Sequence, residues 1–67
     1  MHQGESELQM VQRHVREGEA ILERQHAIIS RLSELHLPID RAQELLVTFE
    51  RMQSLHLAHL SRILTLA

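Results

Sequence analysis

A single proline near the middle of the chain is the feature that most limits its possible folds. Pro38 stands in a chain of 67 residues, lacks an amide hydrogen and disfavours the helical conformation at Leu37. A helix arriving from the N-terminal side must therefore end near residues 35–36. Asp40 and Gln43 form a capping-box pattern that starts a second helix, or Pro38 is itself the first helical residue and Asp40 lies in the first turn. Both alternatives predict two helices joined by a short turn.

The first half of the chain carries the pattern of one long amphipathic helix. Ser6 and Gln9 form a capping-box pattern, which predicts a helix over residues 6–36 after a flexible tail of residues 1–5. The apolar residues recur at heptad spacing and the remaining positions are mainly polar, which is typical of a helix with one buried face. The predicted stripe consists of Leu8, Val11, Val15, Gly18, Leu22, Gln25, Ile29 and Leu32, flanked by His14, Ile21, Ile28 and Leu35.

The second half, a predicted helix over residues 40–65, is apolar over a wider arc. Leu55, Leu57 and Leu64 fall outside its main stripe, which indicates that this helix buries two faces. The predicted stripe has one row of Ala42, Phe49, His56 and Ile63, a second of Leu45, Met52, His59 and Leu66, and a flanking row of Leu46, Gln53 and Leu60.

These patterns predict an all-α protein with a single domain over residues 1–67, an antiparallel two-helix hairpin with its turn at about residues 37–40. Folding the chain at the turn pairs residue i with about residue 77 − i, which places Gly18 opposite His59 and Gln25 opposite Met52. A lone hairpin of this length has no closed core, so we expect a homodimeric four-helix bundle, with a higher oligomer or a monomer as the alternatives. The predicted interface residues are Leu22, Ile29, Phe49, Met52, Leu60 and Ile63.

The chain is rich in histidine, with six in 67 residues, so metal binding has to be considered. His56 and His59 form an HxxH pair on one helical face, and His14 or Glu17 is the predicted third ligand. Zinc is the metal that such a set would bind. The alternative is that both histidines pack at the helix seam and bind nothing, in which case the protein has no cofactor.

Two residues of the first stripe are unusual for a helix core. Gly18 costs about 1 kcal/mol relative to alanine inside a helix, so it indicates either close approach of the second helix or a tolerated kink. Gln25 is either a buried amide that fixes the helix register or an exposed side chain.

Several classes of protein are disfavoured by composition. The chain has no cysteine, a formal net charge of −2 and seven dispersed arginines, so we expect neither a disulfide framework nor nucleic-acid binding. It has no apolar run of membrane-spanning length and no signal-peptide pattern, which predicts a cytoplasmic protein with no membrane partner. No nucleophile motif accompanies its serines, so we expect no enzyme activity.

Four segments carry a resemblance to a known group of proteins. They are residues 14–19 with Gly18, residues 24–29, residues 45–50 with Phe49, and the terminal HxxH of residues 56–59. In this order the chain, from about residue 14 to 64, resembles a group of short, mainly proteobacterial, all-helical proteins of unknown function. That group has a turn rich in glycine and aspartate, whereas residues 37–40 here read Leu-Pro-Ile-Asp, so the resemblance does not extend to the turn.

The sequence as a whole predicts a non-enzymatic helical interaction protein that binds a second copy of itself and a further protein partner. The alternatives are a weak metal-binding module built on the HxxH pair and a small helical regulator of a signalling or transcription protein.

Overall fold

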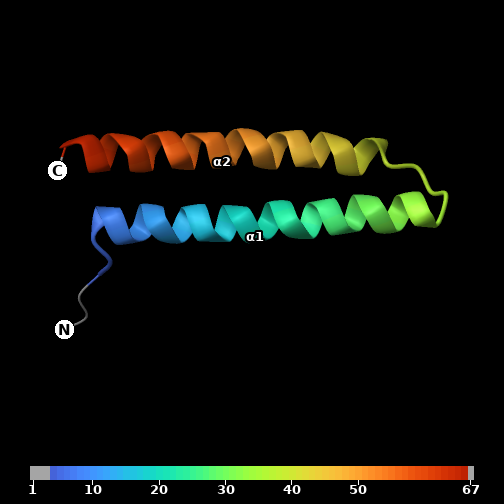
Figure 1. The fold of residues 1–67 in the computed structure, drawn as a ribbon, viewed down its shortest axis with the longest axis horizontal. Helices are drawn as coiled ribbons and strands as arrows, with labels where there is room; N and C mark the ends of the chain where they lie inside the picture. Colours follow the sequence, from blue (N-terminus) through green and yellow to red (C-terminus); the bar gives the residue numbers. More distant parts are fainter. Residues whose placement is uncertain (1–3, 67) are drawn as a thin grey trace.

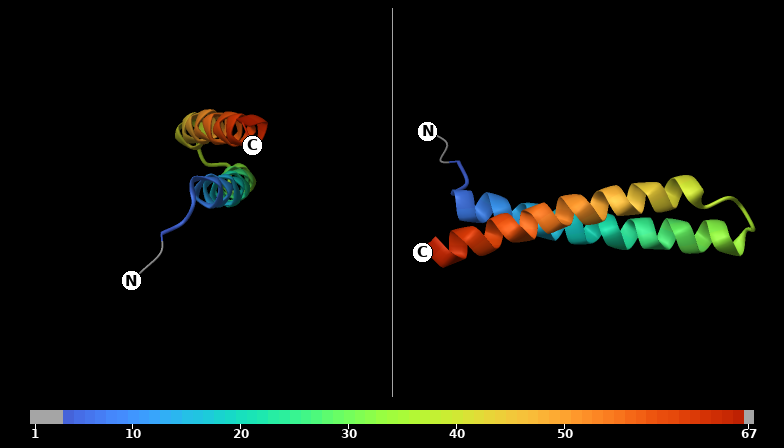
Figure 2. Two further views of the ribbon diagram at one scale, coloured as in Figure 1. Left: turned by 90° about the vertical axis from the view of Figure 1, so that its left-hand side faces the viewer. Right: turned by 90° about the horizontal axis from the view of Figure 1, so that it is seen from above.

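The computed structural model describes residues 4–66, which form an all-helical hairpin. Helix α1 spans Glu7–Glu34 and helix α2 spans Asp40–Leu66, and the two lie antiparallel and in contact along their lengths (Figure 1). The views of Figure 2 show a single layer of two helices that cross at a shallow angle. Of the predicted tail, residues 1–3 lie outside the described residues, while Gly4 and Glu5 precede the helix.

The start of α1 is the predicted capping box. The Gln9 amide N–H donates to Ser6 Oγ at 3.1 Å, and the Ser6 amide N–H donates to Gln9 Oε1 at 3.0 Å. Two of the free amides at the helix N-terminus are thereby satisfied, and Glu7 in the first turn complements the helix dipole.

The end of α1 is a Schellman motif. The Leu37 N–H donates to the Leu32 carbonyl at 2.9 Å, and the His36 N–H donates to the Ser33 carbonyl at 3.0 Å. His36 adopts a left-handed conformation with φ of 57°, a region that favours glycine. The helix therefore ends at Glu34, one turn before the proline, through its own capping hydrogen bonds.

The start of α2 matches neither predicted alternative in full, because Asp40 is not the capping residue and Pro38 is not helical. The Gln43 N–H donates to the Ile39 carbonyl at 2.8 Å, so Ile39 occupies the cap position. Asp40 is then the first helical residue, where its carboxylate faces the positive end of the helix dipole.

The helices pack along the predicted stripe of α1, but α2 is rotated relative to its predicted stripe. Leu45 and Met52 were expected to face α1 and are instead 45% and 49% exposed, whereas Gln53 is only 6% exposed. The prediction was wrong because a polar residue was given a flanking position. The α2 residues that are buried or half-buried are Ala42, Leu46, Phe49, Gln53, His56, His59, Leu60 and Ile63.

The predicted register also has to be corrected. Gly18 packs against Gln53, six residues before its predicted partner His59, and the Gln25 side chain bonds to the Ala42 carbonyl, ten residues before Met52. Figure 1 shows why: the connection of residues 35–39 runs back along α1 before α2 begins. The two helices are therefore offset by about two helical turns from a tight hairpin.

Candidate functional site

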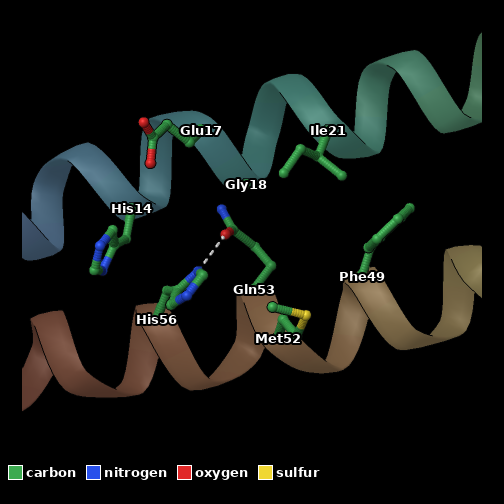
Figure 3. A pocket seen from close by; sticks show the side chains of 8 residues that line it. All are labelled: His14, Glu17, Gly18, Ile21, Phe49, Met52, Gln53 and His56. Atoms are coloured by element: carbon green, nitrogen blue, oxygen red, sulfur yellow. Dashed lines mark hydrogen bonds between the residues drawn. The ribbon is translucent and has the colours of Figure 1, made fainter.

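A groove opens between the two helices on one side of the hairpin (Figure 3). It has a volume of about 230 Å³ and a mostly apolar lining. Each helix contributes four residues at spacing i, i+3, i+4 and i+7, which are the corners of the hole that accepts a side chain in knobs-into-holes packing. The groove residues are His14, Glu17, Gly18 and Ile21 from α1 and Phe49, Met52, Gln53 and His56 from α2.

The floor of the groove depends on the pairing of Gly18 with Gln53. Gln53 Nε2 donates to the Val15 carbonyl at 2.9 Å, and the amide is buried. A Cβ atom on Gly18 would overlap this amide, since it would lie 2.6 Å from Gln53 Cδ. Of the two explanations for the glycine, close approach is therefore correct, with the Gln53 side chain as the neighbour.

Gln53 also orients a histidine at the end of the groove. Because its Nε2 is committed to the Val15 carbonyl, its Oε1 is the acceptor for His56 Nδ1, 3.3 Å away (Figure 3). In the neutral ring, Nδ1 then carries the proton and Nε2 keeps its lone pair. The His14 ring, from the facing helix, lies 5.4 Å from the His56 ring between centroids, with the ring planes at 37°.

The predicted metal ligands are not gathered at one point. His56 faces His14, but His59 lies one turn further along α2, with Nε2 3.6 Å from Glu7 Oε2. Among residues 4–66, no group of three or more potential ligands has the geometry to hold a metal ion. The HxxH pair is thus divided between two different partners on α1.

Glu17, the other predicted third ligand, belongs to an ion-pair chain at the groove rim. Arg13 Nη1 lies 3.2 Å from Glu17 Oε1, and Arg13 Nη2 donates to Glu5 Oε1 at 2.8 Å. The hydrogen bond from Arg13 is the main reason that the pKa of Glu5 lies below its ordinary value, and the same pairing raises the pKa of Arg13.

A row of exposed apolar side chains continues from the groove towards the connection. Ile21 and Ile28 stand seven residues apart along α1, and Leu35 follows after another seven as the residue that caps α1. Leu45 and Met52 stand seven residues apart along α2. Their exposed fractions range from 39% for Ile21 to 52% for Leu35. Ile21 and Met52 both line the groove, so the two rows run along the same side of the hairpin. We call these five residues the exposed apolar face.

Most of the predicted interface residues lie elsewhere. Met52 belongs to the exposed apolar face, whereas the other five are half-buried in the seam between the helices, namely Leu22, Ile29, Phe49, Leu60 and Ile63. The sequence did carry a signal for the exposed face, because Ile21, Ile28 and Leu35 form a heptad row beside the main stripe.

A second, shallow hollow is lined by residues of α2 alone. Exposed Leu57 and Leu64 and half-buried Leu60 surround it together with Ser61 and Thr65. α1 contributes no lining residue to this hollow, whereas both helices contribute to the exposed apolar face.

Comparisons with protein-family models, with curated proteins and with solved structures find no match to this chain. Within the described residues, neither helix combines the length and the apolar character needed to cross a bilayer.

Proposed function

We propose that the protein is a non-enzymatic helical interaction protein that associates through its exposed apolar face into a homodimeric four-helix bundle. The observation that carries this proposal is the alignment of apolar rows from both helices on one side of a hairpin. In this proposal it works in the cytoplasm, with neither a nucleic acid nor a membrane as a partner. The absence of cysteine and the dispersed arginines support that assignment.

The shape of the hairpin supports association. The molecule is only 13 Å across in its thinnest direction, so the buried seam is a single line of contacts. Among the described residues, the buried hydrophobic side chains are Val11, Val15 and Ala42, which is a small core for a chain of 67 residues. Small domains without disulfides or metals gain stability by oligomerisation, and contiguous exposed apolar surface marks where they do so.

Light scattering tests the proposal. At micromolar concentration the protein should have about twice the 7.8 kDa mass of one chain. Ile28→Glu places a charge in the middle of the exposed apolar face and should give a monomer, whereas Ala27→Glu, on the outer face of α1, should leave the dimer intact. A wild-type protein that is fully helical and monomeric contradicts the proposal.

A second candidate function is weak zinc binding by His14 and His56. Two imidazoles that share a zinc ion at ~2.0 Å have ring centroids ~5 to 6 Å apart, and these two rings are 5.4 Å apart. The bond from His56 Nδ1 to Gln53 resembles the outer-shell hydrogen bond that orients ligating histidines. Water would complete the usual four ligands, so the affinity should be modest.

Calorimetric titration with zinc tests this second function. His14→Gln and His56→Gln should each abolish the binding heat, whereas His59→Gln should leave it unchanged because His59 faces Glu7. Wild-type protein without heat above the buffer background contradicts zinc binding. Equal loss in His59→Gln would assign the site to the HxxH pair.

A further inference from the structure

The exposed apolar face has a symmetry that restricts how two copies can meet. Antiparallel helices advance by the same rise per residue, and Ile21 and Met52 lie together at the groove. Ile28 and Leu45, each seven residues closer to the connection, must therefore also lie level with one another. These four side chains form a rectangle on one side of the hairpin.

A two-fold axis brings a surface against itself, so the surface must be complementary to itself. With the axis through the centre of the rectangle and across the helices, Ile21 meets Ile28 of the second copy, and Leu45 meets its Met52. The connections then lie at opposite ends. With the axis along the helices, the connections lie at the same end and Ile21 meets the second copy's Met52. The apolar rows allow both arrangements.

The groove distinguishes the two. With the connections at the same end, the groove of one copy lies opposite the groove of the other, and two hollows face each other across the interface. Unfilled volume in an interface forfeits packing contacts. With the connections at opposite ends, each groove lies opposite the segment between Ile28 and Leu35 of the second copy. Leu35 is 52% exposed, and in this arrangement Leu35 of the second copy lies opposite the His14 end of the groove.

Charges beside the apolar rows favour the same arrangement. Glu17, Arg24 and Arg31 are exposed and stand seven residues apart along α1, next to the row that starts at Ile21. With the connections at opposite ends, the dimer contains two Glu17–Arg31 pairs between copies, and Arg24 of one copy faces Arg24 of the other near the axis. With the connections at the same end, the dimer instead contains two Arg31–Arg41 pairs between copies. Two attractive pairs and one repulsive pair are preferable to two repulsive pairs.

We infer that the occupant of the groove is Leu35 of a second copy, in a dimer whose two connections lie at opposite ends and whose Glu17 and Arg31 pair between copies. This inference rests on the proposed dimer and adds its arrangement. It also gives the groove, which is open in a single hairpin, an apolar side chain to fill it.

Cross-linking tests the arrangement, because the chain has no cysteine of its own. Arg24→Cys and Thr48→Cys are exposed positions close to the expected axis. Treated separately with a short bis-maleimide reagent, each variant should form covalent dimers, because each cysteine faces the same cysteine of the second copy. Ala27→Cys, on the outer face of α1, is the matched control and should stay monomeric. Cross-links that form only when the Arg24→Cys and Thr48→Cys chains are mixed overturn the arrangement.

Charge exchange gives an independent test with opposite signs for the two arrangements. Glu17→Arg and Arg31→Glu should each weaken the dimer about threefold to tenfold, and the double variant should restore it. With the connections at the same end, Arg31→Glu would instead strengthen the dimer by facing Arg41. Light scattering on the same samples separates the two proposals. A monomeric wild type overturns the dimer itself, while a dimer with mixed cross-links or a strengthened Arg31→Glu variant overturns only its arrangement.

Discussion

Two glutamines determine how the helices meet at the scale of single residues. Gln25 Nε2 donates to the Ala42 carbonyl at 2.8 Å, and Gln53 Nε2 donates to the Val15 carbonyl at 2.9 Å. Both amides are buried, and each bonds to the backbone of the opposite helix. A shift of one helix along the other would leave both amides without these partners, at a cost of ~1 to 3 kcal/mol each. The glutamines therefore fix the register more strictly than the apolar side chains do.

The pairing of Gly18 with Gln53 makes a prediction whose sign depends on the second residue. Gly18→Ala should gain ~1 kcal/mol in helix propensity. It should also displace the buried Gln53 amide, which costs more than this gain, so the free energy of unfolding should be ~1 kcal/mol lower than that of wild type. In a Gln53→Ala background the amide is absent, and the same Gly18→Ala change should stabilise by up to ~1 kcal/mol. Urea denaturation followed by circular dichroism measures both differences. Stabilisation of equal size in the two backgrounds would show that the amide tolerates a Cβ at Gly18.

The ion pair between Glu5 and Arg13 makes a prediction about pH. The hydrogen bond from Arg13 lowers the pKa of Glu5 in the folded chain below its ordinary value. This pair therefore adds stability above the unfolded pKa, and the contribution is lost as pH falls through the folded value. The contribution is small because both side chains are exposed. Arg13→Gln should raise the Glu5 titration midpoint observed by NMR and should lower Tm slightly at pH 7 but not at pH 2. Arg51→Gln, on α2, should leave the Glu5 midpoint unchanged.

At the scale of helices and connections, local signals were predictable and relative placement was not. The capping box of α1, the start of α2 near Asp40 and the buried stripe of α1 depend on neighbouring residues, which the sequence displays directly. The register depends on the path of residues 35–39, and that path is set by the left-handed conformation of His36, for which a histidine gives no signal. For the same reason the predicted ligand set is divided: His14 lies against His56, while His59 lies against Glu7.

The C-terminus of α1 offers a prediction for the connection. His36 has φ of 57°, which costs a residue with a Cβ atom about 1 kcal/mol that glycine does not incur. His36→Gly should therefore stabilise the hairpin by up to ~1 kcal/mol in thermal denaturation, without a change in helix content. Leu37→Gly is the matched control, because Leu37 lies in the same connection without a positive φ and gains nothing from glycine. A loss of stability in His36→Gly would mean that the His36 side chain itself makes a stabilising contact.

At the scale of the whole molecule, the hairpin combines a narrow seam with a broad exposed apolar face. The seam is held by two buried amides and a few aliphatic side chains, and large apolar residues such as Ile28, Leu45 and Met52 remain about half exposed. In the proposed dimer these residues enter the core of a four-helix bundle. Folding and association would then be one process, since neither copy has a closed core alone.

Coupled folding and association predicts that thermal stability depends on protein concentration. For a dimer that unfolds to two chains, each tenfold increase in concentration adds about 1.4 kcal/mol to the free energy of unfolding per dimer. With an unfolding entropy of about 2.1 cal/mol/K per residue, two chains of 67 residues should gain about 5 °C in Tm for each tenfold increase. Circular dichroism at 222 nm from 2 to 200 µM covers two such steps. Ile28→Glu should lower Tm and remove the concentration dependence, while Ala27→Glu should keep it. A wild-type Tm that stays constant over this range would mean that one hairpin is stable alone, and the exposed apolar face would then need a different partner.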